Sequence, residues 1–424
     1  MNETETTRAA PTATGSFFER PQVQVEQIPV GPGVPLGIER VSNPTIGIGG
    51  AYGTWGKCYD NATLPDLIEE RLGRPLQAEE RLHLSDLGFV SRHHLPGLSS
   101  QEDIEVEMQV GAQLLAEAAH ASGWNTSEVE AVLIGQTGPA TADYTEHIAR
   151  MAGIPESALK VSVHKACDGS VGALNLALNP ELPIQRRLPL NLAEALYGKK
   201  VLVGGIEGLS RYMRYARDIQ ALQLFGNGAG VIGVIPGRTI KFLVGGAHEV
   251  YDKEGLLQVR MFYPHSRTRV EGQSAIEVSQ AGKNHFRVAG LMHEPEDESV
   301  AVVMAGLMGM VKLFVRSGVI AVRNVYQSYQ KRMVELGLPG KQIAVAIVHH
   351  ANLKINQLKE KHLQKEGISF PMPWLLSEFG NVSAASNMIV FLRKLASLKP
   401  GDHVLFDGFG AGTYYDVLAV EMGG

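Results

Sequence analysis

The sequence predicts an α/β fold in which helices alternate with buried strands. Short apolar runs, such as EAVLIG at 130–135, are typical of strands buried on both faces of a sheet. Segments with helical spacing separate these runs. The 424 residues also exceed the size at which one hydrophobic core usually stops growing, so we expect two domains or two fused halves.

The first half is expected to begin after a flexible extension. Residues 1–42 are rich in Thr, Ala, Pro and Gly with little periodicity, and regular structure should start at the apolar run 45–50. Ser99 or Ser100 can cap a helix through 102–121, whose first turn is acidic, as the helix dipole favours. Further elements are predicted as strands at 130–135, 158–164, 200–205 and 231–235 and helices at 145–152 and 169–178.

The second half repeats this alternation. Its elements are predicted as strands at 300–304, 344–348 and 403–406 and helices at 306–337 and 384–396. We therefore divide the chain into an extension at 1–42, one half at 43–238 and another at 239–424. Each half places a reactive residue at a strand end with a helix behind it, which indicates an internal duplication.

Composition excludes several classes of function. The net charge of −5, without a long basic run, argues against binding to nucleic acid or to an anionic membrane surface. The longest uncharged apolar run, 299–310, is too short to span a bilayer, and the N-terminus lacks the pattern of a secretory signal. Two cysteines form neither a disulfide framework nor a zinc motif, so we expect a cytoplasmic protein without a metal.

Cys167 is the candidate nucleophile. It lies in HKACDGSVGALNLAL, between a predicted strand and a buried helix whose N-terminus favours the reactive thiolate. Asp168 opposes this by raising the pKa of the thiol unless its carboxylate is paired, and Lys165 or His164 could offset it. The alternative is that Cys167 is a small buried hydrophobic residue, as most unpaired cysteines are. That interpretation is preferred for Cys58, which has no supporting motif.

His349 and Asn381 are the candidate partners of this thiol. His349 follows a strand in VHHANLKI, and Asn381 lies in FGNVSAAS. A single thiol with distant His and Asn partners is typical of a cysteine site assembled in space. Taken alone, the His pair could be structural, and the second motif could be a helix cap made by Ser383.

The glycine-rich turn DGFGAGTYY could aim backbone N–H groups at a substrate oxygen, or it could be an ordinary turn. FGNGAG at 225–230 lacks the spacing of a phosphate-binding loop.

Together these segments resemble the thiolase superfamily, and within it the β-ketoacyl-acyl carrier protein synthase III-like condensing enzymes. HKACDGSVGALNLAL is similar to the family's nucleophile segment, FGNGAGV to FGDGAGA, and VVMAGLMGMVKLFV to the strand-MAG-helix entry to the second half. VHHANLKI is similar to PHQANxRI, FGNVSAAS to HGNTSAAS, and FGAGT to FGGGF. The six motifs occur in family order over residues 44–424.

The resemblance implies a five-layered αβαβα fold of two similar halves, usually a homodimer, with no cofactor. It implies that Cys167 is the nucleophile and that His349 and Asn381 form the decarboxylation pair. It also implies an oxyanion hole made by the backbone N–H groups of Cys167 and Ala411. Lys354 takes the family's basic position near the phosphopantetheine entrance, with Asn352 beside it as a further substrate- or carrier-binding residue.

Several departures from the family pattern suggest a specialised enzyme. His350 stands where Gln is common, and Asp168 replaces a small residue. The region around Asp86 and Gly88 lacks the arginine of a coenzyme A adenine clamp, so we expect an acyl carrier protein, rather than free acyl-coenzyme A, to deliver the substrate. The 263–295 segment is unusual, and it could shape the entrance or a dimer contact.

The predicted function is that of a ketosynthase III-like acyltransferase in fatty acid or polyketide biosynthesis. An acyl-cysteine would condense with a malonyl-type or β-ketoacyl thioester by decarboxylative Claisen chemistry. The nearest alternative passes the acyl group to an alcohol or amine, with His349 as general base; Asn381 favours carbon–carbon bond formation. The intact Cys-His-Asn set argues against a non-catalytic partner subunit. Polar groups gathered at strand ends argue against a non-enzymatic binding protein.

Overall fold

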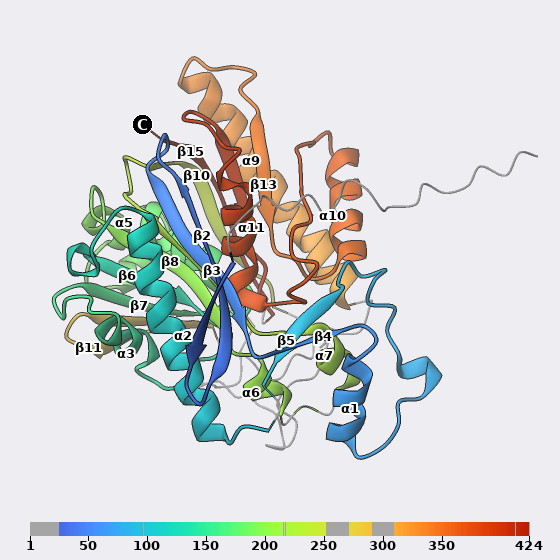
Figure 1. Ribbon diagram of the computed structural model, residues 1–424. Coiled ribbons are helices and arrows are strands. Elements are labelled where there is room, and N and C mark those ends of the chain that lie inside the picture. The colour runs from blue at the N-terminus through green and yellow to red at the C-terminus, as the bar shows by residue number, and fades with distance from the viewer. Residues whose placement is uncertain are drawn as a thin grey trace, which may run out of the picture.

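Two β-sheets form the centre of the molecule (Figure 1). The computed structural model describes residues 25–251, 271–290 and 309–423, apart from positions 96, 215, 217 and 412. The larger sheet has the order β1-β2-β3-β9-β8-β6-β7-β12-β11, the smaller one β10-β15-β14-β13, and β4 pairs with β5 in a separate ribbon. Strands β8, β6, β7 and β12 run parallel, as do β13 and β14.

The strands of the larger sheet are β1 (Val25–Val30), β2 (Val34–Asn43), β3 (Ile48–Trp55), β6 (Ala131–Gly135), β7 (Leu159–His164), β8 (Val201–Glu207), β9 (Gly228–Val234), β11 (Ile276–Gly282) and β12 (His285–Gly290). Those of the smaller sheet are β10 (Ile240–Glu249), β13 (Ile343–Val348), β14 (His403–Asp407) and β15 (Tyr414–Met422), and the ribbon is β4 (Lys57–Asp60) with β5 (Ser91–His94).

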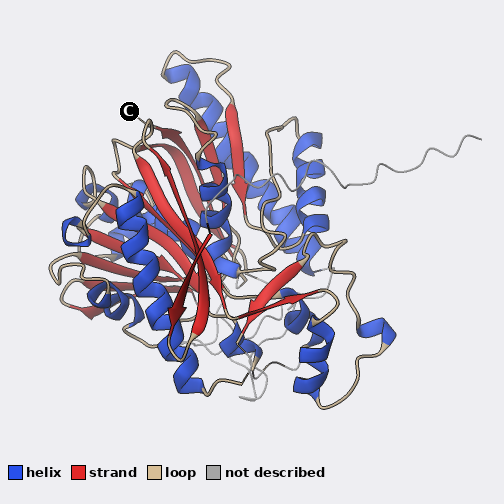
Figure 2. Cartoon of the chain, viewed as in Figure 1, coloured by secondary structure: helices blue, strands red, loops and turns tan. Residues whose placement is uncertain are grey.

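Helices cover and separate the two sheets, which gives the five-layered αβαβα arrangement (Figures 1 and 2). The outer face of the larger sheet carries α2 (Ser100–Ala121) and α3 (Tyr144–Met151). Between the sheets lie α4 (Gly169–Leu178) and α11 (Ser386–Leu395). The far side of the smaller sheet carries α9 (Gly318–Glu335), which contacts α10 (Leu353–Lys365). The predicted fold class is confirmed.

Local sequence explains the central and outer helices. Every residue of α4 is buried, as its nearly continuous apolar pattern predicts. In α2, Ser99 is the cap: its hydroxyl accepts from the Glu102 N–H at 3.3 Å, while the Glu102 carboxylate accepts from the Ser99 N–H at 2.7 Å. The short helices α1 (Leu64–Leu72), α5 (Leu192–Ala195), α6 (Ser210–Met213) and α7 (Ile219–Leu224) complete the first half. None of the described helices is long and apolar enough to cross a bilayer.

The prediction that 1–42 is a flexible extension is wrong for its second part. Residues 1–24 lie outside the described residues, but β1 and β2 form a hairpin at the edge of the larger sheet. Val34, Leu36 and Ile38 are buried, which is the period-two pattern of a strand. Three of the residues that suggested an extension, Gly31, Pro32 and Gly33, instead form the turn of this hairpin.

The second half differs from its prediction in its two predicted helices, and the predicted strand at 300–304 lies outside the described residues. The helix predicted from 306 begins, within the described part, with a π-helical stretch at Met310–Ser317 before α9, and the helix predicted from 384 is a 3₁₀ turn at Ser383–Ala385 followed by α11. Part of the unusual 263–295 segment is the β11–β12 hairpin, which joins the larger sheet beside β7.

The close approach of α4 to β6 yields a stability prediction. A Cβ atom on Gly135 would lie 2.1 Å from the carbonyl carbon of Gly169, so backbone would meet backbone. Gly135→Ala should lower the free energy of unfolding by about 1–3 kcal/mol, as other overpacking substitutions do. Gly246→Ala is the matched control, since its Cβ would make only an ordinary 3.8 Å contact with Val325. Equal urea midpoints for the two variants would contradict the prediction.

Candidate active site

The candidate site lies at the carboxyl ends of the parallel strands. Cys167 follows β7, Thr137 follows β6, and Glu207 is the last residue of β8. His349 follows β13, whose parallel neighbour β14 ends at Asp407. Because the carboxyl ends of parallel strands meet at one edge of a sheet, side chains far apart in sequence converge there.

Backbone strain marks the turn that presents the thiol. Ala166 and Ser383 are the two non-glycine residues with positive φ in the described part of the chain, at 49° and 47°. Each such conformation costs about 1–2 kcal/mol. Ala166 directly precedes Cys167, and the Ser383 Oγ lies 3.1 Å from the Cys167 Sγ. Both strained residues therefore flank the partly buried thiol, which is where strain accompanies function in other proteins.

A buried ion triad lies beneath this turn. The Lys165 Nζ is 2.9 Å from the Asp168 Oδ2 and also pairs with Asp416 from β15, and all three side chains are at most 5% exposed. Asn175 completes the site by donating to the Asp416 Oδ1 at 2.6 Å. Burial alone would lower the pKa of Lys165, but the two carboxylates hold it above its ordinary value. The pairing of Asp168 that the sequence required is thus present.

The thiol is not acidified by the helix N-terminus, contrary to the sequence prediction. Burial raises the pKa of Cys167 to about 12. A hydrogen bond from Ser383 lowers this pKa, whereas the negative charges of Glu207 and Asp168 raise it further. Because desolvation outweighs the dipole here, the thiol needs a proton acceptor at the moment it reacts.

His349 is a neutral imidazole held in a fixed orientation. Burial lowers its pKa to about 3, and the positive charge of the buried Lys359 acts in the same direction. Its Nδ1 lies 2.7 Å from the Ser386 Oγ. When Ser386 donates to Nδ1, the proton of the neutral ring lies on Nε2, which then faces away from Ser386 as a donor.

Asn381 is fixed by the turn that contains Ser383. Its side-chain oxygen accepts from the Ser383 N–H at 2.9 Å, and its Nδ2 lies 3.4 Å from the carbonyl oxygen of Ala351, two residues after His349. Segment 381–386 thus contacts Cys167 through Ser383 and His349 through Ser386. The structure brings the three predicted residues around this one segment.

The glycine turn at 408–411 packs against the nucleophile turn. A Cβ atom on Gly408 would lie 2.1 Å from the Asp168 Oδ1, and one on Gly410 would lie 2.1 Å from the carbonyl oxygen of Lys165. Only glycine fits at these two positions. Ala411, the predicted oxyanion-hole residue, is buried in the same apolar cluster as Ala166.

The predicted carrier-binding residues lie at the start of α10. Lys354 is exposed, and its Nζ is 3.3 Å from the Asp86 Oδ2. The Asn352 side-chain oxygen caps α10 by accepting from the Ile355 N–H at 2.9 Å. His350 stacks on Trp374 with ring centroids 4.3 Å apart.

Comparison with known proteins agrees with this architecture. Residues 333–422 match the family model described as 3-oxoacyl-[acyl-carrier-protein (ACP)] synthase III C terminal. The β-ketoacyl-[acyl-carrier-protein] synthase III 2 of Vibrio cholerae is 23% identical over 386 residues, which are 87% of each chain. A mycobacterial β-ketoacyl-[acyl-carrier-protein] synthase III from Mycobacterium ulcerans is 37% identical over 98 residues, 22% of this chain and 28% of that protein.

Solved structures show the same fold. The 3-oxoacyl-[acyl-carrier-protein] synthase III of Aquifex aeolicus superimposes with a TM-score of 0.55 at 17% identity, covering 94% of this chain and 100% of that one. The 1,3,6,8-tetrahydroxynaphthalene synthase of Streptomyces coelicolor, a type III polyketide synthase, gives 0.56 at 12% identity, covering 87% and 96%.

The chain therefore has the fold of these condensing enzymes. In sequence it is similar to the β-ketoacyl-[acyl-carrier-protein] synthases III. Within the described residues, no three His, Cys, Asp or Glu side chains are grouped so that they could hold a metal ion.

Three polar residues of the site, Glu207, Thr137 and Ser386, were not predicted from the sequence. Glu207 accepts at its Oε1 from the Thr137 N–H and hydroxyl, both at 2.7 Å, and burial raises the pKa of Glu207 to about 8. Ser386, the third, holds His349 through its hydroxyl. The sequence did contain a signal for Glu207, because this acidic residue directly follows the buried run VLVGGI. His349 was selected on the same ground, since it too follows a buried strand.

The low pKa of His349 predicts a pH dependence of stability. Between its unfolded value of about 6.5 and its folded value of about 3, the unfolded chain binds more protons, so stability falls as the pH is lowered. In His349→Gln this contribution disappears. The slope of unfolding free energy against pH should decrease by up to about 1.4 kcal/mol per pH unit, which corresponds to one proton. Urea titrations from pH 7 to 4 measure it, and an unchanged slope would refute the assignment.

Proposed function

We propose that this protein is a ketosynthase of the synthase III type, acting in the cytoplasm in fatty acid or polyketide biosynthesis. Cys167 takes an acyl group from a thioester, and the acyl-enzyme then condenses with a malonyl-type or β-ketoacyl thioester. The observation that carries the proposal is the gathering of Cys167, His349 and Asn381 around segment 381–386. The names of the relatives, which include synthases III and a polyketide synthase, favour the same chemistry.

In the first step, the sulfur of Cys167 attacks the thioester carbonyl, and the carrier thiol leaves with one proton. The oxyanion is held by the backbone N–H groups of Cys167 and Ala411. Loss of one such donor typically costs about 2.7–4 kcal/mol of transition-state stabilisation. The contact of the 408–411 turn with the nucleophile turn supports this pairing of donors.

In the second step, His349 and Asn381 bind the thioester oxygen of the incoming malonyl-type group. Loss of carbon dioxide leaves an enolate, whose carbon attacks the acyl-Cys167 carbonyl. A neutral imidazole that donates from Nε2 suits this role, because the charge that develops in the step is negative. The low pKa of His349 and its contact with Ser386 support that state.

Delivery by an acyl carrier protein rather than coenzyme A fits the entrance. The region around Asp86 lacks the arginine of the family's adenine clamp, and Asp86 itself pairs with Lys354. The exposed Lys354 would meet the acidic carrier or its phosphopantetheine phosphate, while Asn352 holds the helix that presents it. A homodimer is the expected assembly.

Acylation of Cys167 is the first test. Intact mass spectrometry after incubation with a panel of acyl thioesters should show a covalent adduct on the wild-type protein and none on Cys167→Ala. Cys58→Ser, which removes the exposed second cysteine, should keep the adduct. Equal labelling of wild type and Cys167→Ala would rule out the proposal.

The second test asks whether His349 acts in decarboxylation and not in acylation. His349→Ala should still form the acyl-enzyme but should release carbon dioxide from the malonyl thioester at least about a hundredfold more slowly, since its oxyanion donor is gone. Trapping of labelled carbon dioxide measures the loss. If wild type transfers its acyl group to an alcohol or amine without releasing carbon dioxide, the protein is an acyltransferase instead.

A further inference from the structure

A continuous hydrogen-bonded chain links the Cys167 thiol to a buried carboxylate. The Cys167 Sγ lies 3.1 Å from the Ser383 Oγ, which lies 2.5 Å from the Thr137 Oγ1. That hydroxyl lies 2.7 Å from the Glu207 Oε1. Thr137, Ser383 and Glu207 are at most 4% exposed, so bulk water does not interrupt the chain.

We propose that Glu207 is the proton acceptor for Cys167, acting through the hydroxyl groups of Ser383 and Thr137. This inference deepens the proposed function and rests on it for the identity of the acyl donor. Glu207, Thr137 and Ser383 are positioning and relay residues, and Cys167 alone forms the covalent bond.

The transfer is balanced in protons. Before transfer the thiol donates to the Ser383 Oγ; after transfer Ser383 donates to the sulfur, which is the direction that lowers the pKa of Cys167. As Sγ bonds to the acyl carbon, its proton passes to the Ser383 Oγ. Ser383 passes its own proton to Thr137, and Thr137 passes its own to the Glu207 Oε1. All three hydrogen bonds reverse direction, since each hydroxyl both donates and accepts. The carbon–sulfur bond to the carrier then breaks, and the proton on Glu207 returns through Thr137 and Ser383 to the departing thiolate, which leaves Glu207 as the carboxylate.

The alternative acceptor, His349, is poorly matched to this task. Burial lowers the pKa of His349 to about 3, so the imidazole holds a proton weakly near neutrality. Burial raises the pKa of Glu207 to about 8, close to the working range of a general base. The N–H groups of Thr137 and Ala384, at 2.7 and 3.1 Å from Oε1, keep the carboxylate form accessible despite its burial.

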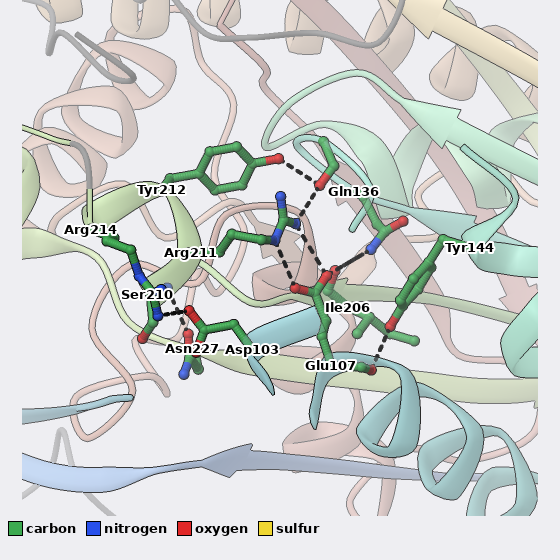
Figure 3. Close-up of polar contacts among 11 residues, drawn as sticks. Asp103, Glu107, Gln136, Tyr144, Ile206, Ser210, Arg211, Tyr212, Arg214 and Asn227 are labelled. Atoms are coloured by element: carbon green, nitrogen blue, oxygen red, sulfur yellow. Dashed lines mark hydrogen bonds and ion pairs between the residues drawn. The ribbon is translucent and has the colours of Figure 1, made fainter. Parts of the chain in front are cut away.

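A second polar network anchors the residues next to Thr137 and Glu207. Figure 3 shows Glu107 held by Arg211, with Gln136 and Tyr144 beside it. The Gln136 side chain donates to the carbonyl oxygen of Ile206 at 3.2 Å, next to Glu207. On the other side of Thr137, the Gly138 carbonyl accepts from Tyr212 at 2.6 Å and from Arg211 at 3.1 Å. The residues adjoining Thr137 and Glu207 are therefore anchored, which fixes the relay geometry.

The charged and titratable groups that face Glu207 come from four elements. They are Cys167 from the nucleophile turn, Glu107 from α2, Tyr144 from α3 and Tyr212 from α6. Arg211 from α6 is paired with Glu107 at 3.3 Å. Glu107 and Glu207 are the two carboxyl groups in this set. Only Glu207 is joined to the Cys167 sulfur through hydroxyl groups, so the ionisation of Glu207 controls the loss of the thiol proton.

The test uses alkylation of Cys167 by iodoacetamide, which needs no acyl substrate. All proteins are full length and carry Cys58→Ser, so that only Cys167 reacts. In this background the alkylation rate should rise with pH and level off above an inflection near pH 8, where Glu207 becomes able to accept the proton. In Glu207→Gln the inflection should disappear, and the rate should rise steadily toward the thiol's own high pKa. The buried Glu39→Gln, outside the site, is the matched control and should keep the wild-type profile.

Two substitutions of Thr137 separate the relay from simple packing. Thr137→Val keeps the shape but removes the hydroxyl, and should slow alkylation at pH 8 by about 100-fold or more. Thr137→Ser restores the hydroxyl and should return the rate to within about twofold of wild type. Thermal melting confirms that each variant is folded.

The inference is overturned if Glu207→Gln keeps the inflection, or if Thr137→Val reacts as fast as Thr137→Ser. Failure of the proposed function would look different. In that case no thioester would acylate Cys167, yet the alkylation profiles would still depend on Glu207 and Thr137.

Discussion

The buried triad of Lys165, Asp168 and Asp416 is the constraint on which the site depends. It brackets the strained Ala166 and ties the nucleophile turn, at the end of β7, to β15 of the smaller sheet. Removing one member of such a buried cluster leaves an uncompensated charge and typically costs about 3–5 kcal/mol. The 408–411 turn packs directly against Lys165 and Asp168 of this triad. The triad therefore fixes the position of the thiol relative to its predicted oxyanion donors.

Burial has opposite consequences for the ionisable groups gathered here. It raises the pKa of Cys167 and of Glu207 and lowers that of His349, because in each case the charged form is the one that loses its hydration. The carboxyl group becomes a base that works near neutral pH, and the imidazole becomes a neutral donor. Desolvation thus gives different chemical roles to the ionisable groups around segment 381–386.

Much of this arrangement could be predicted from the sequence. The buried helix after Cys167 and the strands ending at His164 and Val348 follow from apolar runs, and the six ordered motifs identified the fold. The hairpin of β1 and β2 was missed because the composition of residues 1–42, rich in Thr, Ala, Pro and Gly, was given more weight than a short period-two pattern. The state of the thiol was also mispredicted, since the helix dipole is visible in sequence while desolvation depends on tertiary packing. Glu207 was missed because its partners, Thr137 and Ala384, are 70 or more residues away.

The β11–β12 hairpin closes one rim of the larger sheet. A bare β7 would offer a row of unpaired N–H and C=O groups, which is a template on which a foreign strand can add. β12 takes up those groups along Lys160–His164, and the outermost described strand at this rim becomes β11, with exposed Ser279 and Gln280. A second molecule that extended the sheet here would meet β11, two strands from the backbone that carries Cys167. Intermolecular β-pairing at this rim would therefore not involve β7, the strand that leads to Cys167.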